Sequence, residues 1–366
     1  MTRARDIANL GNNTTNLETL DTLYGDNVLT GRNMVINGNF SVFQRGTSAT
    51  TVSGNDIFAA DRFKGWANGG GTFTVEQSTD VPNNEFEFSA KLTNTATDSS
   101  VAAGDNYRWA TDLEGYTVSR LAYGHSDAKA VTLSFWVKSS LTGTYCGALY
   151  SVTASRHYIY EYTISSANTW EKKTITVSSG DTTGSWNRTN GNGLRVYWGF
   201  GSGTTYQGTA GAWTAGEKWE TSSQAAWIGS ASATFYITGV QLEVGETATP
   251  FEHEDYGTTL KKCKRYYQVY DNIQGMTLHC YNTSHAYTSI QYPDGIMRAT
   301  PTATVNYSSG DSFALAGSGK TISAREIVGV KPNVFMFKLT ASSLTAGQAG
   351  HYDKDSTNIF QFDAEL

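Results

Sequence analysis

Apolar and polar residues alternate with a period of two through most of the chain, in short runs separated by turns rich in Gly, Ser, Thr and Asn. Such alternation is typical of strands that bury one face. Near the middle of the chain, Val131, Leu133, Phe135 and Val137 all fall on one side of one such run. The length and spacing of these runs predict an all-β domain, a β-sandwich, over residues 33–254.

The longest run, TFYITGVQLEVGETATPF, occupies residues 234–251. It has apolar residues on both faces and ends at Gly245, ahead of Pro250, which predicts a central strand that closes the domain. The polar Gln241 and Glu243 could line a groove or hold a cation. A strict period of two divides the side chains between opposite faces, with Tyr236, Thr238, Val240, Leu242 and Val244 on one and Phe235, Ile237, Gly239, Gln241 and Glu243 on the other.

The first part of the chain follows a different pattern. Steps of three and four residues predict a short helical seam through Leu10, Asn13, Leu17, Leu20 and Tyr24. Gly11 and the NNTTN run weaken this helix, and so short a seam is marginal in water on its own. Residues 1–32 are therefore either a flexible leader or an arm for attachment or oligomerisation.

The pattern changes again after the sandwich. Leu260, Cys263, Tyr267 and Tyr270 recur at helical spacing behind Thr258, a residue type that caps helices. The alternation then returns, and strands are predicted at residues 287–292, 301–307, 322–330, 334–340 and 358–365. A second, smaller β domain is thus expected over residues 255–366.

The net charge argues against a nucleic-acid partner, and the short apolar runs argue against insertion into a membrane. The chain has 27 basic and 33 acidic residues, a net charge of −6, so no general attraction to nucleic acid is expected. No run approaches the roughly 20 apolar residues that span a bilayer, and the first residues lack the apolar run of a signal peptide. Neither membrane insertion nor export by a signal peptide is expected.

A local basic cluster indicates either a solvated helix face or an anion site: Lys261, Lys262, Lys264 and Arg265.

Composition narrows the class of protein further. Charged residues make up only 16% of the chain, whereas Gly contributes 37 residues and Tyr 21, which is typical of a turn-rich secreted or virion protein. Cys146, Cys263 and Cys280 fit neither a disulfide framework nor a CxxC metal site, and are expected to be buried thiols. No GxSxG, HExxH or Walker pattern occurs, so the chain is expected not to be an enzyme.

Aromatic side chains offer the best candidate chemistry. A sugar ring can stack its C–H face on Trp or Tyr, while neighbouring polar groups bond its hydroxyls. Long Gly-rich loops, in which functional residues often gather, are expected at residues 178–193 and 201–229. The candidate glycan contacts lie in these loops or on the second face of a strand: Trp136, Trp186, Arg188, Trp213 and Trp219. The alternative for each Trp is burial beneath a loop.

Four ordered motifs resemble a recurrent arrangement in tail fibres and other structural proteins of tailed bacteriophages. They are NMVINGNFSVFQRGTS, FAADRF, TFYITGVQLEVGETATPFE and YGTTLKKCKRYYQ, at residues 33–48, 58–63, 234–252 and 256–268. The leader TRARDIANLG and the C-terminal segments PDGIMRATPTATV and NIFQFDAEL are similar to parts of the same proteins. In this chain, Phe43 and Phe63 stand where Trp is usual, and Lys264 where Gln is common.

The resemblance implies a jelly-roll domain like those of carbohydrate-binding modules. It also implies a homotrimer, mounted on other phage tail proteins through residues 1–32 and presenting its C-terminal tip domain to the host. Related jelly-roll modules often hold a structural Ca²⁺ between their first and last strands. If that site carries over, its oxygen donors would be Asn37, Asn39, Gln241 and Glu243. No other cofactor is expected.

Together these expectations describe a non-enzymatic tail-fibre protein of the virion tail, assembled in the host cytoplasm, that recognises a host cell-surface polysaccharide. Two alternatives remain open. One is a purely structural virion component, such as a neck, collar or capsid decoration that binds other phage proteins. The other is a polysaccharide-degrading tailspike, which the absence of a long β-helical repeat in the sequence disfavours.

Overall fold

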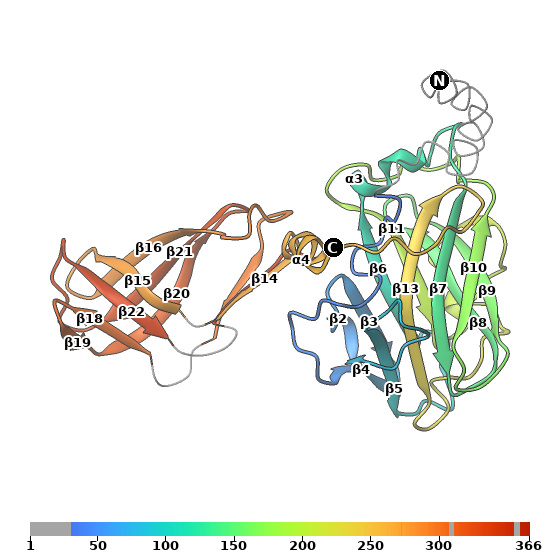
Figure 1. The fold of residues 1–366 in the computed structure, drawn as a ribbon, viewed down its shortest axis with the longest axis horizontal. Coiled ribbons are helices and arrows are strands. Elements are labelled where there is room, and N and C mark those ends of the chain that lie inside the picture. Colours follow the sequence, from blue (N-terminus) through green and yellow to red (C-terminus); the bar gives the residue numbers. More distant parts are fainter. Residues whose placement is uncertain (1–30, 272, 307–310, 355–358) are drawn as a thin grey trace, which may run out of the picture. The chain divides into compact units, whose positions relative to one another are not determined.

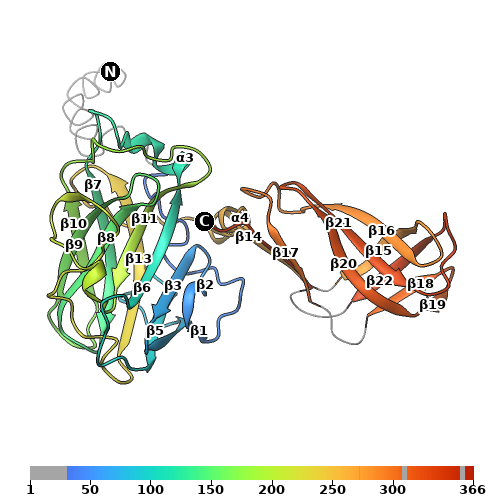
Figure 2. The ribbon, with the colours of Figure 1, turned by 180° about the vertical axis from the view of Figure 1, so that it is seen from behind.

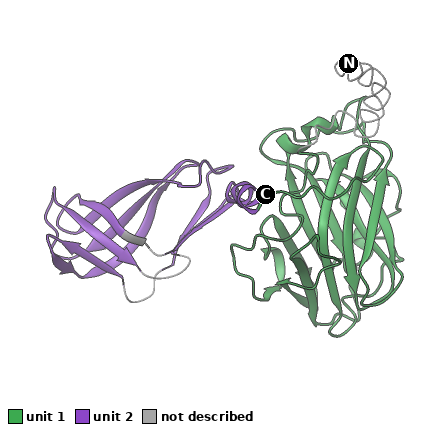
Figure 3. Ribbon diagram, viewed as in Figure 1, with its two compact units in different colours: residues 1–255 green, residues 256–366 purple. Residues whose placement is uncertain are grey.

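The chain consists of two compact units, residues 1–255 and 256–366 (Figure 3). The boundary expected from the sequence was one residue earlier. The computed structural model describes residues 31–271, 273–306, 311–354 and 359–366. The predicted arm over residues 1–32 therefore lies almost wholly outside the described residues.

The first unit is a sandwich of two antiparallel sheets (Figures 1 and 2). The six-stranded sheet has the order β1 (Thr50–Val52), β4 (Thr72–Ser78), β5 (Ser89–Ala96), β13 (Thr234–Val244), β7 (Val131–Ser139) and β10 (Glu171–Val177). The seven-stranded sheet has the order β12 (Trp213–Ala215), β9 (Arg156–Ile164), β8 (Gly143–Ser151), β11 (Asn192–Gly199), β6 (Asn106–Glu114), β3 (Phe63–Asn68) and β2 (Gly54–Phe58). Within residues 31–255, the described part of this unit, short helical turns occur at α3 (Gly115–Val118), η1 (Ser119–Leu121) and η2 (Thr204–Tyr206). The predicted jelly-roll β-sandwich is confirmed.

Aromatic rings fill the centre of the sandwich. Phe135 of β7 meets Trp198 of β11 edge to face, with ring centroids 5.8 Å apart, and Phe63 stacks on Trp109 at 6.1 Å. All four side chains are fully buried. Such pairs add about 0.5–1.5 kcal/mol beyond the burial of their area. The apolar side of β7 that the alternation predicted is the side that faces this core.

Strand β13 departs from the predicted alternation at a bulge. Its pairing with β7 changes register between Thr238 and Gln241, and Gly239 has φ +63°. A bulge inserts one residue, so the strand changes the parity of its faces at this point. The core-facing residues of the strand are Phe235, Ile237, Val240 and Leu242. The predicted two-face division is therefore wrong beyond the bulge.

Substituting Gly239 tests this bulge. Its φ lies in the left-handed region, and an added Cβ would lie 2.8 Å from the ring of Phe86. We expect Gly239→Ala to lower the free energy of unfolding by about 2 kcal/mol, from backbone strain and overpacking. Chemical denaturation measures the change. Gly211→Ala, at a φ of +87° with nothing within 4 Å, is the matched control and should cost less; an equal cost in both would contradict the role of the Phe86 contact.

Two of the segments that resemble phage proteins, residues 33–48 and 234–252, meet at β13. The N–H of Val240 donates to the carbonyl of Gly38 at 2.9 Å, and a Cβ on Gly38 would lie only 2.1 Å from the Val240 oxygen. The carboxylate of Glu252 accepts the N–H groups of Gly31 and Asn33 at 2.5 and 2.7 Å. These motifs therefore fasten the beginning of the described unit to its end, which is a structural role.

The second unit begins with α4 (Tyr256–Lys264) and continues with two sheets. The three-stranded sheet has the order β14 (Tyr267–Tyr270), β23 (Phe360–Asp363) and β17 (Thr302–Val305). The seven-stranded sheet has the order β19 (Ser318–Lys320), β18 (Ser312–Leu315), β22 (Ala349–Lys354), β15 (Ile273–Cys280), β16 (His285–Gln291), β21 (Val334–Ala341) and β20 (Ile322–Val330). Its core is rich in Phe, including Phe335, Phe337, Phe360 and Phe362.

The smaller β domain is confirmed, with differences in detail. The helix is shorter than predicted, because Tyr267 and Tyr270 lie in β14 rather than on a helix face. Strands were predicted near β16, β17, β20, β21 and β23, whereas β14, β15, β18, β19 and β22 were not predicted. Several of these are short or half-exposed, so their alternation is weak in the sequence.

Candidate functional site

The outer face of the seven-stranded sheet of unit 1 is covered by the loop at residues 201–229, called here the covering loop. Its Trp219 stacks on Tyr206 with ring centroids 4.2 Å apart. The guanidinium of Arg108, from β6, lies 3.9 Å from the ring centroid of Trp219. Trp219 is fully buried, so it offers no surface on which a sugar could stack. For this residue the alternative of burial beneath a loop holds.

The same face carries a buried ion network. The carboxylate of Asp112 lies 2.7 Å from the ammonium of Lys64 and is bonded by both ends of the Arg195 guanidinium, one contact being 2.9 Å. Burial by itself would raise the pKa of Asp112, but the two cations hold it well below its usual range. Lys64 and Arg195 are both paired with Asp112, so the network stabilises the sheet and is not a ligand site.

Two further predicted residues belong to a packed aromatic group. Trp186 and Trp213 lie 5.5 Å apart, and Tyr123 contacts them at 4.8 and 5.4 Å. Trp186 is buried, while Trp213 is partly exposed. Arg188 is exposed, and its guanidinium lies 3.0 Å from Nε2 of His125. The structure thus brings Trp186 and Trp213 together as packing partners.

The outer face of the six-stranded sheet has a different character. Cross-strand pairing places aromatic and charged side chains in one line across β4, β5, β13 and β7, and Trp170, the residue before β10, continues the line beside Lys138. All but one of these side chains remain partly exposed; Lys138 is the buried one. This line, called here the Tyr236 row, consists of Glu76, Lys91, Tyr236, Lys138 and Trp170.

Contacts within the Tyr236 row fix its side chains. The ammonium of Lys138 lies 4.2 Å from the ring centroid of Tyr236 and 5.4 Å from that of Trp170. Asp80 bonds to Lys138 and accepts the indole N–H of Trp170 at 2.9 Å. Burial alone would raise the pKa of Asp80, but the bonds from Lys138 and Trp170 lower it. The row therefore presents held aromatic rings and a charged carboxylate at a surface.

Polar rows lie on both sides of the Tyr236 row. The pairings place Thr74, Thr93 and Thr234 along one side and Thr238, Trp136 and Lys172 along the other. Trp136, which the sequence predicted as a glycan contact, is partly exposed here. Sequence reasoning missed Trp170 and Tyr236, because the row exists only through pairing of strands distant in the chain.

Gln241 and Glu243, the oxygen donors predicted on β13 for a cation, form hydrogen bonds with the segment that follows the strand. The carboxylate of Glu243 accepts both the N–H and the hydroxyl of Thr249, at 2.9 and 2.7 Å. The side-chain oxygen of Gln241 accepts the N–H of Glu252 at 2.8 Å. Both side chains are buried. They hold the segment after β13 against the outer face of the sheet.

The two predicted asparagine donors are also used within the turn that contains them. The Asn37 side-chain oxygen accepts the N–H of Val42 at 3.0 Å, and that of Asn39 accepts the Ser41 hydroxyl at 3.2 Å. Among the described residues, no group of three or more His, Cys, Asp or Glu is placed to hold a metal ion. The structural Ca²⁺ stays a prediction. The three cysteines, all within the described residues, are buried thiols that form no disulfide, in agreement with the sequence.

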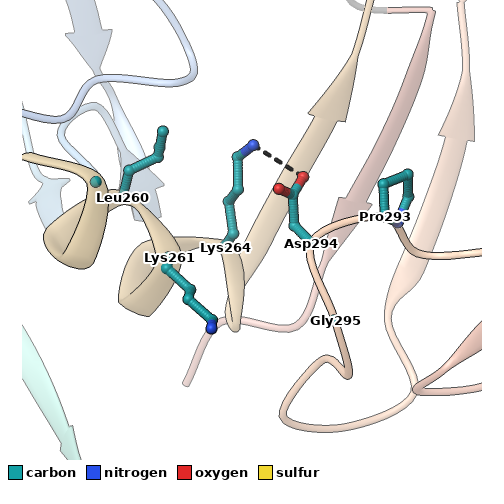
Figure 4. A pocket seen from close by; sticks show the side chains of 7 residues that line it. Leu260, Lys261, Lys264, Pro293, Asp294 and Gly295 are labelled. Carbon is teal, nitrogen blue, oxygen red and sulfur yellow. Dashed lines mark hydrogen bonds and ion pairs between the residues drawn. The ribbon is translucent and has the colours of Figure 1, made fainter.

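The basic cluster of unit 2 borders a pocket of about 450 Å³ between α4 and the turn at residues 293–295 (Figure 4). Lys264 is paired with Asp294 at 2.8 Å. In Figure 4 the side chains of Lys261 and Lys264 leave the helix in different directions, so the two cations do not converge on one point. This arrangement favours a solvated helix face over an anion site.

Comparison with known proteins gives weak structural likenesses. No family profile and no curated protein sequence matches the chain. The enzymatically active domain of tailspike protein 4 of bacteriophage CBA120 is 14% identical, over 58% of this chain and 22% of that one, with a TM-score of 0.30. The family 11 carbohydrate-binding module of Lic26A-Cel5E from Clostridium thermocellum is 11% identical, over 56% of this chain and 99% of that one, with a TM-score of 0.28.

A putative sugar-binding protein from Bacteroides thetaiotaomicron is 12% identical, over 58% of this chain and all of that one, with a TM-score of 0.31. At these TM-scores, function has to be argued from the residues of the chain itself. Within the residues described, no helix is long and apolar enough to cross a membrane.

Proposed function

We propose that unit 1 binds a glycan along the Tyr236 row. The observation that carries this proposal is the line of partly exposed Tyr236 and Trp170, fixed by Asp80 and Lys138 and bordered by hydroxyl groups. Rings supply surfaces for the C–H faces of sugars, and the charged and hydroxyl groups bond sugar hydroxyls. On the opposite sheet the rings of Trp66, Tyr197 and Trp219 are buried, so they offer no surface to a sugar.

The dimensions of the row suit a chain rather than one sugar. Neighbouring strands lie about 4.8 Å apart, so a row that crosses from β4 to the start of β10 extends over about 19 Å. That is a run of several linked sugar units. Lys91 pairs with Glu76 at 2.6 Å and Lys138 with Asp80, so the row is nearly balanced in charge and suits a polysaccharide with few charges.

The wider proposal is a receptor-binding appendage of a tailed-phage virion, which binds host surface polysaccharide without cleaving it. Its support is the set of ordered motifs that resemble tail-fibre proteins, together with the aromatic row. Attachment through residues 1–32 and assembly as a homotrimer belong to the same proposal. Three copies held together would convert a weak single-site affinity into firm adhesion by avidity.

Removal of the Trp170 ring tests the row. We expect Trp170→Ala to weaken binding of host polysaccharide about tenfold, because it removes a stacking surface and the partner of Asp80. Isothermal titration with purified host polysaccharide measures the affinity. Tyr116→Ala is the matched control, since Tyr116 is 61% exposed and lies outside the row. Equal loss in both variants, or in neither, would argue against the row as the site.

Two observations separate the proposal from its alternatives. A structural virion component would bind no glycan from the host, and a reconstruction of the particle would place it without an outward surface. A tailspike would release reducing ends from host polysaccharide during incubation. Binding without such release, at the outside of the tail, is the expected result.

A further inference from the structure

A separate cavity of about 290 Å³ lies at one end of unit 1, where the turn after β5 meets the covering loop. None of the residues that line it belongs to the Tyr236 row. Its wall includes Asp98 and Ser99 from the turn and Gln207, Ser222, Ala226 and Ile228 from the covering loop. The cavity is close to the lower end of the size range of ligand pockets, which suits one small ring.

Polar groups with unused hydrogen-bonding capacity surround the cavity. Ser99 and Ser222 are exposed, and their hydroxyls form no hydrogen bond with any other described residue. Gln207 donates its Nε2 to the carbonyl of Ser202 at 2.8 Å, which leaves its side-chain oxygen available. Ile228 adds an apolar surface. Hydroxyl and amide groups around an apolar wall are the groups that bind a sugar ring.

The charge of the lining selects among sugars. The ionisable side chains in it are the carboxyls of Asp98 and Glu220, and no Lys, Arg or His contributes to the lining. Burial would raise the pKa of Asp98, but the Tyr107 hydroxyl and the Ser100 N–H, at 2.7 and 3.0 Å, lower it. Asp98 is therefore charged near neutral pH. An anionic ligand would meet this charge without a cation to compensate it.

Glu220 supports the wall from behind. Its side chain is fully buried, and its carboxyl oxygens accept the N–H groups of Gly201 and Ser202 at 3.0 and 2.7 Å. Trp219, next to it, donates its indole N–H to the Ser202 hydroxyl at 3.0 Å. Glu220 thereby holds the main chain that forms one side of the cavity and, because it is fully buried, acts on the cavity through that main chain. It is a positioning residue.

We propose that this cavity binds a single neutral sugar ring and rejects uronic and other anionic sugars. The proposal rests on the proposed function, in which unit 1 recognises a glycan. It adds a second subsite, for one sugar of that glycan, at the end of the sandwich. Recognition there depends on the free groups of Ser99, Ser222 and Gln207, and exclusion of anions depends on Asp98.

Saturation-transfer NMR of the full chain tests the cavity with single sugars. The probes are the methyl glycosides of glucose, galactose and mannose, N-acetylglucosamine, and glucuronate. We expect saturation transfer to at least one neutral probe and none to glucuronate. Ala226→Trp, at the exposed edge of the lining, should fill the cavity and abolish the signal. Ala231→Trp, exposed but outside the lining, should leave it unchanged. The proposal would be overturned if glucuronate bound as tightly as the neutral probes. It would also be overturned if binding of the neutral probes were unchanged in Ala226→Trp.

A milder substitution tests the cavity even if the Ala226→Trp variant does not fold. Ser99→Ala removes one exposed hydroxyl and should weaken binding of the neutral probe by about threefold to tenfold. Failure of the cavity and failure of the proposed function are distinguishable. If the wild-type chain binds host polysaccharide but no single sugar, only the cavity proposal falls. If it binds neither, both fall, and Trp170→Ala should affect polysaccharide without changing the signal from single sugars.

Discussion

Replacing Asp112 with asparagine is expected to destabilise unit 1 by about 3 kcal/mol. The carboxylate is 2% exposed and is the shared partner of Lys64, which is 3% exposed, and of Arg195, which is 12% exposed. Asparagine keeps the size of the side chain but removes its charge. Lys64 and Arg195 then lose the buried anion that they share. Lys64 keeps its contact with the exposed Asp56 at 2.8 Å, but buried charge with less compensation is costly. Chemical denaturation of the wild type and of Asp112→Asn gives the difference in the free energy of unfolding.

The matched control for this experiment is Glu76→Gln. It makes the same chemical change in the same unit, at an ion pair with Lys91 in which both side chains are about one-third exposed. Exposed pairs contribute about 0–1 kcal/mol, so the control should be nearly neutral. Lys64→Met in the Asp112→Asn background should recover part of the loss, because it removes one of the two buried cations that shared the Asp112 carboxylate. A loss in Asp112→Asn no larger than in the control would show that the network contributes little.

The sequence was sufficient for the fold class because strands that bury one face carry a strong period of two. It was insufficient for β13, where one glycine changes the parity of the strand. Gly239 in the middle of a run of apolar residues signals a bulge only weakly, since glycine also occurs in regular strands. The outward position of Gln241 and Glu243 was foreseen, but their use as anchors for Thr249 required the path of the following segment.

The candidate site was predictable only in part, for a similar reason. Trp136 was found because it lies opposite the apolar side of its own strand, a property of one segment. Tyr236 and Trp170 come together through pairing of β13 and β10 with β7, which no local pattern encodes. The Trp residues of the long loops looked like exposed candidates, yet Trp186 and Trp219 are buried. A loop rich in aromatic residues can cover a sheet as well as bind a ligand.

The two outer faces of the sandwich explain why the proposed glycan contacts differ from most of those predicted from the sequence. Large rings occur on both, but on the seven-stranded sheet Arg108 sits among Trp66, Tyr197 and Trp219 beneath the covering loop. There the rings pack against other side chains of the protein. On the six-stranded sheet the rings of Tyr236 and Trp170 are only partly covered. Exposure, rather than the number of aromatic residues, distinguishes the proposed binding face.

The stability of unit 1 is expected to fall as the pH rises from about 4.5 to about 7, through the carboxyl of Glu220. Burial raises the pKa of Glu220 from 4.5 to about 7, although the N–H groups of Gly201 and Ser202 act to lower it. The folded state therefore binds this proton more tightly than the unfolded chain. Below the unfolded value both states are protonated, and above about 7 both are charged. Between these limits the folded state loses about 3 kcal/mol relative to the unfolded chain.

Glu220→Gln isolates this contribution from the other carboxyls, among which Asp112 acts in the opposite direction because its pKa is lowered on folding. Glutamine keeps an oxygen that can accept from Gly201 and Ser202 but does not titrate. The free energy of unfolding, measured by denaturant titration at closely spaced pH values, should fall more steeply with pH in the wild type than in the variant. The gap between the two curves should grow by about 3 kcal/mol from pH 4.5 to 7.5 and then stay constant. Parallel curves would mean that Glu220 titrates alike in the folded and unfolded states, and that water reaches its carboxyl behind the covering loop.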